Sequence, residues 1–293
     1  MSALKPGDKV AFLGVGKMGS HMADALARAG FAVTGWSRSV AEAPAGALYS
    51  VRASAMDAVR HAAAVVVCLR DQHVTEQVLF ESGLASAIPR GAVVIDTGTT
   101  GPEVAKEHAA AFTKFGVFYL DAPVSGGTGA AEKAALSIFV GGGAEAFERG
   151  QPLLSAMGLA VHLGPAGAGQ TAKLANQIIV GVTIAAVAEG LAFAERNGIA
   201  PRELIEALAN GFAGSKVLEV HGPRMASRDF SAPGAIRLHL KDLRLAAQDD
   251  GLRSLLHAKL VKDGFMKLAA EGHDELDHSA YAKLYELQAE PAP

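Results

Sequence analysis

The sequence predicts an α/β fold in which an N-terminal Rossmann domain with a mostly parallel sheet precedes an all-helical C-terminal domain. From Lys9 to about Leu163, short apolar runs alternate with helix-like segments, a pattern typical of βαβ units. After the glycine-rich stretch 164–169 no comparable run appears, and Ala, Leu, Glu and Lys recur at helical spacing. The length of 293 residues also exceeds that of a usual single domain. We therefore expect one domain over residues 1–164 and a second over residues 165–293.

The apolar runs mark the strands expected in the first domain. They lie at residues 10–13, 32–36, 64–69, 93–96, 118–121, 138–140 and 161–163. The single cysteine, Cys68, falls in the third of these runs. A lone cysteine has no intramolecular disulfide partner, so we interpret it as a buried strand residue.

A long helix is expected to open the second domain, over residues 168–197. Gly198 would end it as a left-handed cap, with Pro201 beyond. The helix is apolar nearly all round, so it should be covered on every side, as the spine between the domains or as part of a subunit interface. Its uncharged stretch, residues 174–188, falls short of the roughly 18 residues that a membrane span needs. We therefore expect a buried helix.

Composition and charge exclude several classes of protein. Half of the residues are hydrophobic and 19% are charged, unlike a disordered chain. A net charge of -3 and a pI near 6.4 provide no basic field for a nucleic acid. Residues 1–9 lack the apolar core of a signal peptide. We expect a cytoplasmic protein with neither nucleic acid nor membrane as a partner.

A glycine-rich turn directly follows the first expected strand and leads into a helix-like segment. In such a turn the first glycine permits the tight bend, the second lets a pyrophosphate approach the backbone, and the third allows close helix packing. The helix N-terminus offers free N–H groups and a positive dipole end to the phosphates. The order of strand, turn and helix therefore predicts a dinucleotide site. Its residues are Gly14, Gly16, Lys17, Met18 and Gly19.

The end of the second expected strand indicates which cofactor binds. Domains that hold NAD commonly carry Asp or Glu there for the ribose hydroxyls, but this chain has Ser37-Arg38-Ser39. Arg38 can pair with a 2′-phosphate, and the two serines add donors. The alternative is an exposed arginine on an ordinary loop. We favour NADP(H) over NAD.

A loop rich in glycine follows the expected strand at 118–121. The Ser125 hydroxyl and the N–H groups of Gly126 and Gly127 can form a concave set of donors for a carboxylate. The loop lies at the carboxyl edge of the expected sheet, where open α/β sheets bind ligands. A proline-glycine turn without a ligand is the alternative.

Lys173 and Asn176 lie near the start of the long expected helix. Three residues separate them, so they share one face. Burying a lysine lowers its pKa toward the range useful for proton transfer at neutral pH. The alternative is a lysine whose amine reaches solvent at the helix end.

Four ordered motifs, at residues 14–22, 121–142, 167–177 and 239–243, resemble the β-hydroxyacid dehydrogenase family and together span almost the whole chain. Within the family the chain is similar to tartronate semialdehyde reductases, also called 2-hydroxy-3-oxopropionate reductases. That similarity lies in residues 211–215, 233–243 and 277–280. The resemblance implies a 6-phosphogluconate dehydrogenase-like fold and a homodimer or homotetramer.

The resemblance also implies a role for each site residue. Lys173 would be the general acid/base, and Asn176 would position the substrate and the lysine. The remaining implied residues are Ser125, Gly126 and Gly127 as the substrate-holding loop, Thr99 as a nicotinamide-side contact, and Lys241 as a residue lining the substrate and cofactor in the closed site. A hydride would pass from the nicotinamide to the carbon of a small carboxylated aldehyde, such as tartronate semialdehyde, glyoxylate or succinic semialdehyde, while Lys173 protonates the oxygen.

The chain departs from the family pattern at three positions. The pair Leu69-Arg70, which we count among the cofactor-binding residues, replaces the usual leucine-proline and could alter cofactor affinity. Ala134 replaces a glycine, which puts the fine shape of the substrate loop in doubt. Val15 replaces leucine, a conservative change.

Three alternative functions stay open: oxidation of the 3-hydroxyisobutyrate dehydrogenase type, imine reduction, and a non-catalytic NADP-binding module. Imine reductases share both halves of the fold but generally lack the lysine at 173 and the loop at 125–127, so carbonyl chemistry is favoured. The partner expected is a small carboxylate substrate. No metal is expected, because the histidines lack the H-E-x-x-H spacing and no Cys/His cluster is evident.

Overall fold

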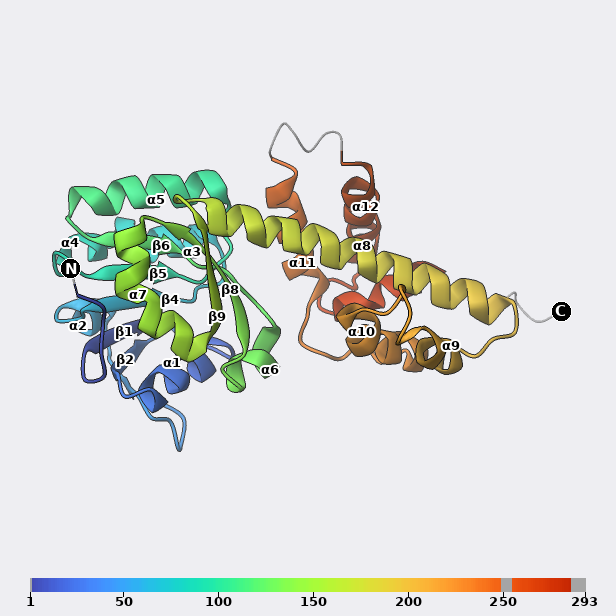
Figure 1. Cartoon of the computed structure of the whole chain (residues 1–293), viewed down its shortest axis with the longest axis horizontal. Helices are drawn as coiled ribbons and strands as arrows, with labels where there is room; N and C mark the ends of the chain where they lie inside the picture. Colours follow the sequence, from blue (N-terminus) through green and yellow to red (C-terminus); the bar gives the residue numbers. More distant parts are fainter. Residues whose placement is uncertain (1, 249–254, 286–293) are drawn as a thin grey trace. The chain divides into compact units, whose positions relative to one another are not determined.

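The computed structural model describes residues 2–248 and 255–285. The chain divides into two compact units, Met1–Lys173 and Leu174–Pro293. Helix α8 (Ala168–Arg196) begins in the first unit and continues through the second (Figure 1). The fold class expected from the sequence is confirmed.

The first unit is a mostly parallel sheet with helices on both faces. Strands β3, β2, β1, β4, β5 and β6 are parallel neighbours in that order, while β8 pairs antiparallel with β6 and β7 and parallel with β9. The strands are β1 (Lys9–Leu13), β2 (Ala32–Trp36), β3 (Ser50–Val51), β4 (Ala64–Val67), β5 (Val93–Asp96), β6 (Phe118–Asp121), β7 (Val124–Ser125), β8 (Leu136–Gly142) and β9 (Gly158–Gly164). The two-residue strands β3 and β7 were not expected, because runs so short leave no periodicity to detect.

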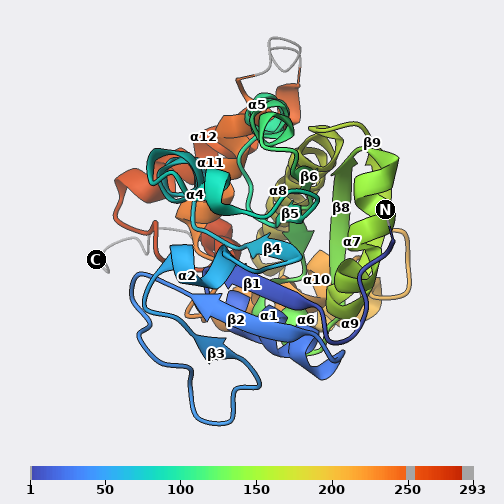
Figure 2. The same ribbon diagram turned by 90° about the vertical axis from the view of Figure 1, so that its left-hand side faces the viewer.

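Alternation along each strand divides the core of this unit between the two faces of the sheet. Val10 and Phe12 of β1 pack with α1 (Gly19–Arg28) and α7 (Ala144–Met157). Ala11 and Leu13 face the opposite way, toward α5 (Pro102–Lys114). Figures 1 and 2 show α5 and α1 on opposite sides of the sheet. Covering both faces explains why these strands read as continuous apolar runs rather than as alternating ones. The shorter helical segments are α2 (Ala55–Val59), α3 (Gln72–Glu76), η1 (Gln77–Glu81), α4 (Leu84–Ala87) and α6 (Gly127–Glu132).

The interpretation of Cys68 as a strand residue is wrong. Strand β4 ends at Val67, and Cys68 follows it with a half-buried side chain and a free thiol. Its N–H still donates to Leu13 O at 2.8 Å. The apolar run in the sequence continues past the ladder, so it hid the true end of the strand.

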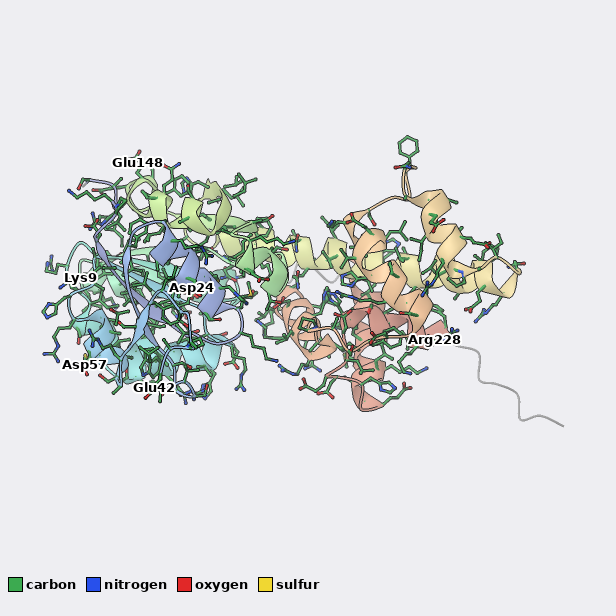
Figure 3. All side chains as sticks on the ribbon, turned by 90° about the horizontal axis from the view of Figure 1, so that it is seen from below. Lys9, Asp24, Glu42, Asp57, Glu148 and Arg228 are labelled. Carbon is green, nitrogen blue, oxygen red and sulfur yellow. The ribbon has the colours of Figure 1, made fainter. Side chains whose placement is uncertain are left out.

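The described part of the second unit is helical apart from an isolated bridge between Ala235 and Asp277. Its apolar core joins α8 to side chains such as Leu240, Phe265 and Tyr281. Arg228, labelled in Figure 3, follows α10 in the left-handed conformation. It pairs with Glu195 of α8 at 3.4 Å. After α8 the elements are α9 (Pro201–Leu208), α10 (Lys216–Ser227), α11 (Ile236–Ala246), α12 (Leu256–Ala270) and the 3-10 helix η3 (His278–Tyr285).

Helix α8 is less buried than its sequence suggested. Gly198 follows it with a φ of +82°, as expected of a left-handed cap. In the single chain, however, Ile179 and Phe193 are 66% and 70% exposed, so the chain alone does not cover the helix on every side. The expectation that this apolar stretch is too short to span a membrane is wrong. By length and composition alone α8 could cross one, because an 18-residue window within it has a mean hydropathy of 1.8. Core helices of soluble proteins share that composition, so it does not identify a membrane span.

Candidate functional site

The glycine-rich turn between β1 and α1 has the geometry of a phosphate-binding loop. Gly14 has a φ of +106°, and a Cβ on it would lie 2.2 Å from Cys68 O. A Cβ on Gly19 would lie 2.0 Å from Gly14 O, so this glycine lets the helix start directly against the turn. Gly16, by contrast, has open space around it. A pyrophosphate can therefore approach the backbone at Gly16 and meet the N-terminus of α1, where Lys17 is exposed and Met18 precedes the first helical residue.

The residues expected at the ribose end of the cofactor directly follow β2. Ser37 is half-buried, Arg38 and Ser39 are exposed, and the two hydroxyl oxygens lie 3.5 Å apart. Residues 37–39 contain no carboxylate. The guanidinium of Arg38 is thus accessible to an anion at the end of the strand, as a 2′-phosphate requires.

Arg70 follows β4 and is held by a neighbour. Its Nε lies 3.0 Å from Asp71 Oδ2, with the arginine side chain 69% exposed. The other carboxylate oxygen, Asp71 Oδ1, accepts from Val74 N at 3.0 Å and caps α3. Leu69, next to it, is half-buried. The ion pair offsets the charge that Arg70 adds to this edge of the sheet.

Gln170, on the first turn of α8, holds the loop that follows β5. Its Oε1 accepts hydrogen bonds from Thr100 N at 3.1 Å and from Gly101 N at 3.2 Å. Its Nε2 donates to Gly98 O at 2.9 Å. Thr99, the expected nicotinamide-side contact, lies inside this clamped loop and is half-buried. The start of α8 therefore sets the position of the loop within the first unit.

Asp121 anchors the start of α8 to the sheet. Its carboxylate lies at the end of β6 and accepts from Gly167 N at 2.8 Å and from Gln170 N at 2.9 Å. A negative charge at a helix N-terminus is favourable, because it meets free N–H groups and the positive end of the dipole. Burial nevertheless raises the pKa of Asp121, an effect that these hydrogen bonds oppose.

Lys173 is buried, with 8% of its surface exposed. It lies three residues after Gln170 on α8, so both side chains leave the same face of the helix. That face is the one clamped to loop 98–101. By helical spacing, the expected proton donor therefore leaves α8 on the side that holds the loop with Thr99.

The expected substrate loop turns sharply after β7. Ser125 is half-buried and pairs with Ser137 of β8, and Gly126 and Gly127 have φ values of +129° and +66°. These φ values suit glycine, and they aim successive N–H groups in directions that ordinary strand backbone does not. Ala134, nearby in sequence, has a φ of +51°, which accounts physically for the glycine usual at that position in the family.

In the second unit a hydrogen-bonded chain joins Asn176 to Asp242, the neighbour of Lys241. Asn176 Nδ2 donates to Gln177 Oε1 at 3.0 Å, and Gln177 Nε2 donates to Asp242 Oδ2 at 2.7 Å. Lys241 Nζ lies 3.0 Å from Asp242 Oδ1, close enough for an ion pair but not aligned as a hydrogen bond. Gln177 and Asp242 thus tie two expected site residues together. Sequence reasoning assigned them no role, although both lie inside the motifs that carried the resemblance.

Histidines distant in sequence meet in the second unit. His221, Asp277 and His278 offer possible ligand atoms that all lie within 4.8 Å of one another. The expectation that no Cys/His cluster exists, drawn from spacing along the chain, is therefore wrong in three dimensions. Asp277 is already saturated with donors, since it accepts from Ser279 N and Oγ, Gly234 N and Arg224 Nη1. The nearby guanidinium further disfavours a cation, so the absence of a metal stays our prediction.

Comparisons with known proteins match both units of the chain. Residues 9–164 match the model for the NAD binding domain of 6-phosphogluconate dehydrogenase, and residues 167–285 match the model for NAD-binding of NADP-dependent 3-hydroxyisobutyrate dehydrogenase. A 2-hydroxy-3-oxopropionate reductase from Escherichia coli (strain K12) is 39% identical and covers 96% of this chain and 98% of its own length. An NAD-dependent L-serine dehydrogenase from Pseudomonas aeruginosa is 36% identical, with 95% and 98% covered.

A solved structure gives the same likeness in three dimensions. A 3-hydroxyisobutyrate dehydrogenase from Mycobacterium tuberculosis, solved with L-serine, has a TM-score of 0.85 at 30% identity and covers 96% of this chain and 100% of its own. The likeness therefore extends over both units rather than over the nucleotide-binding half alone.

Proposed function

The chain belongs to the β-hydroxyacid dehydrogenase family of oxidoreductases, and from this premise we propose that it is an NADP-dependent reductase of small carboxylated aldehydes, with Lys173 as the proton donor. The observation that carries the proposal is the buried Lys173, on the face of α8 that clamps loop 98–101. The name of the relative from Escherichia coli supports an aldehyde such as tartronate semialdehyde as substrate. Glyoxylate and succinic semialdehyde are the other members of the class we propose.

The residues of the first unit fit a dinucleotide. Gly14 and Gly19 leave no room for a side chain, whereas the space around Gly16 is open, which is the arrangement a pyrophosphate needs. Arg38, Ser37 and Ser39 would hold the 2′-phosphate of NADP(H). The relative from Pseudomonas aeruginosa is named as NAD-dependent, so the preference for NADP rests on these residues alone.

The chain's own residues would bind and protonate the substrate. Ser125 with the N–H groups of Gly126 and Gly127 would hold the carboxylate, and Asn176 and Lys241 would orient the carbonyl. Bound NADPH would supply the hydride to the aldehyde carbon. Lys173 would then give its proton to the carbonyl oxygen.

Loss of NADPH absorbance tests the proposal directly. Purified protein is mixed with tartronate, succinic, malonate and methylmalonate semialdehydes and with glyoxylate, in parallel with Lys173→Ala. We expect turnover of at least one aldehyde and a fall of about 100-fold or more in kcat for the variant, because general acid catalysis typically contributes 10²- to 10⁴-fold. NADPH affinity should stay unchanged.

Other outcomes of this assay would point to the alternatives. Turnover of cyclic imines but of no aldehyde would favour an imine reductase. Efficient oxidation of 3-hydroxyisobutyrate, with no aldehyde reduced, would favour the oxidative dehydrogenase. NADPH binding with no turnover of any compound would favour a non-catalytic module.

Arg38→Ala tests the choice of cofactor. Because only NADPH has a 2′-phosphate for the guanidinium, we expect the KM for NADPH to rise about tenfold or more, the equivalent of one charge-assisted hydrogen bond. The KM for NADH should hardly change. The matched control is Arg60→Ala, which removes an exposed arginine at the end of α2 and should leave both KM values unchanged. Equal effects of Arg38→Ala on both cofactors would contradict the NADP preference.

A further inference from the structure

A row of polar side chains crosses the second unit from α10 to α8. Arg224 Nη1 lies 3.2 Å from His221 Nδ1, and His221 Nε2 lies 3.2 Å from His278 Nε2. His278 Nδ1 lies 3.1 Å from His239 Nδ1, and His239 Nε2 lies 3.1 Å from the main-chain oxygen of Gln177. The row therefore runs without a gap from a guanidinium to helix α8, beside Asn176.

The carbonyl end gives the row one direction, because a carbonyl oxygen only accepts hydrogen bonds. His239 therefore donates from Nε2 to Gln177 O and accepts at Nδ1. His278 in turn donates from Nδ1 and accepts at Nε2 from His221 Nε2. At the other end, His221 Nδ1 lies 3.2 Å from Arg224 Nη1 and 3.5 Å from Asp277 Oδ1. The contacts of His278 and His239 are thus satisfied by two neutral imidazoles of defined tautomer. In agreement, burial and the two flanking imidazoles lower the pKa of His278 to about 3.

Helix α8 carries a glycine where the row reaches it. A Cβ on Gly181 would lie 2.8 Å from His239 Nε2, so any side chain there would push the imidazole away from Gln177 O. A glycine inside a helix costs about 1 kcal/mol relative to alanine. The helix accepts this cost at a buried position, and the gain is a direct contact between His239 and its backbone.

We propose that this row, through His278 and His239, positions Asn176 for the reaction, an inference that rests on the proposed function. His239 holds the main chain of Gln177. The side chain of Gln177 in turn accepts from Asn176 Nδ2 and donates to Asp242. Fixing Gln177 therefore fixes the orientation of the Asn176 amide. His278 and His239 are positioning residues, because they act on Asn176 through Gln177.

Two glycine-to-alanine variants on the same helix test the proposal. Gly181→Ala displaces His239, whereas Gly190→Ala meets no atom within 4 Å and serves as the control. We expect Gly181→Ala to lower kcat by about 10- to 100-fold, the cost of misplacing a positioning group, with the KM for NADPH unchanged. Gly190→Ala should keep wild-type kinetics. Equal kinetics of the two variants would overturn the proposal.

Replacing His278 separates the hydrogen bond from the bulk of the side chain. Asparagine has an amide N–H near the place of the imidazole Nδ1–H, so His278→Asn should keep a donor toward His239 and most of the activity. His278→Leu removes the donor and should lose about as much kcat as Gly181→Ala. The control is His108→Leu, a buried histidine of the first unit whose ring nitrogens bond no atom of the described residues. Comparable kcat values for His278→Asn and His278→Leu would contradict a positioning role.

A spectroscopic readout keeps the inference separate from the proposed function. In ¹⁵N NMR spectra at pH 7.5, His239 should be an Nε2–H tautomer and His278 an Nδ1–H tautomer. The side-chain amide signals of Asn176 should shift in Gly181→Ala and stay in place in Gly190→Ala. If the wild-type protein shows these signals but is inactive, the proposed function is rejected, while the inference that the row orients Asn176 stands. Unshifted Asn176 signals in Gly181→Ala would overturn the proposal. So would a stoichiometric rise in Tm on adding Zn²⁺ alone, if His278→Leu abolishes that rise.

Discussion

Ala134 has a left-handed backbone conformation, which residues other than glycine rarely adopt. It is one of two non-glycine residues with positive φ in the described part of the chain, the other being Arg228. The left-handed conformation costs an L-residue about 1 kcal/mol or more because Cβ crowds the following carbonyl oxygen. The turn between α6 and β8 therefore keeps its shape against a local strain.

Ala134→Gly should relieve that strain. We expect the free energy of unfolding to rise by about 0.5 to 1 kcal/mol, since glycine removes the Cβ clash but also frees the unfolded chain. Urea denaturation measures the change. Ala110→Gly, at an exposed position inside α5, is the matched control and should lower stability by about 1 kcal/mol. A loss of stability in both variants would show that Ala134 is not strained.

At the scale of elements, α8 presents an apolar stripe to solvent in the single chain. Ile179, Ala186 and Phe193 follow one another at intervals of seven residues, and all three are exposed. A seven-residue spacing keeps side chains on one side of a helix, as in coiled coils. Such a stripe on a long helix is typical of a subunit contact. We therefore propose that α8 packs against a second copy of this chain in a homodimer or homotetramer.

Light scattering after gel filtration tests this proposal. The wild-type protein should elute as a dimer or tetramer, and Ile179→Lys should increase the monomer fraction at micromolar concentration, because a buried unpaired charge disfavours association. Glu189→Lys places the same charge at an exposed polar position of the same helix and should leave the assembly unchanged. A wild-type protein that is monomeric at every concentration would reject the interface.

At the scale of the whole molecule, His278 couples stability to pH. The pKa of His278 falls from an ordinary 6.5 to about 3 in the fold, first because of burial. Between these two pH values the unfolded chain binds a proton that the folded chain does not bind, so stability falls as the pH drops. Asp277 acts at lower pH. Although burial opposes the shift, hydrogen bonds from His221 and Ser279 hold the pKa of Asp277 below its usual range, so its contribution is lost below about pH 4.

We therefore expect the free energy of unfolding to fall by about 2 kcal/mol between pH 7 and pH 5 from His278 alone. Urea titrations at pH 7, 6 and 5 measure the fall. In His278→Asn, which has no imidazole to protonate at this position, the fall should be smaller by about the same amount. The link to His278 would be disproved by parallel pH profiles for the two proteins.

Most of the fold could be read from short-range signals. Apolar runs located the longer strands, and the change of pattern after residue 164 separated the sheet from the helices. The glycine-rich turn was equally predictable from the sequence, because nearby backbone atoms leave no room for a side chain at Gly14 or Gly19. Strand ends were less certain, as Cys68 shows, because hydrophobicity continues where the hydrogen-bonded ladder stops.

The candidate site could likewise be predicted from the sequence only in part. Lys173 and Asn176 lie on one helix, so their spacing alone placed them on one face, and the motifs around them indicated a hydride-transfer enzyme of a known family. The clamp made by Gln170, the link from Gln177 to Asp242, and the meeting of His221, His239 and His278 depend instead on how distant helices pack. The exposure of Ile179 and Phe193 likewise depends on what other elements leave uncovered. The sequence by itself determined the local periodicities and turns, because these arise between near neighbours along the chain. Only the tertiary structure decided which distant polar groups satisfy one another, because that follows from packing and burial.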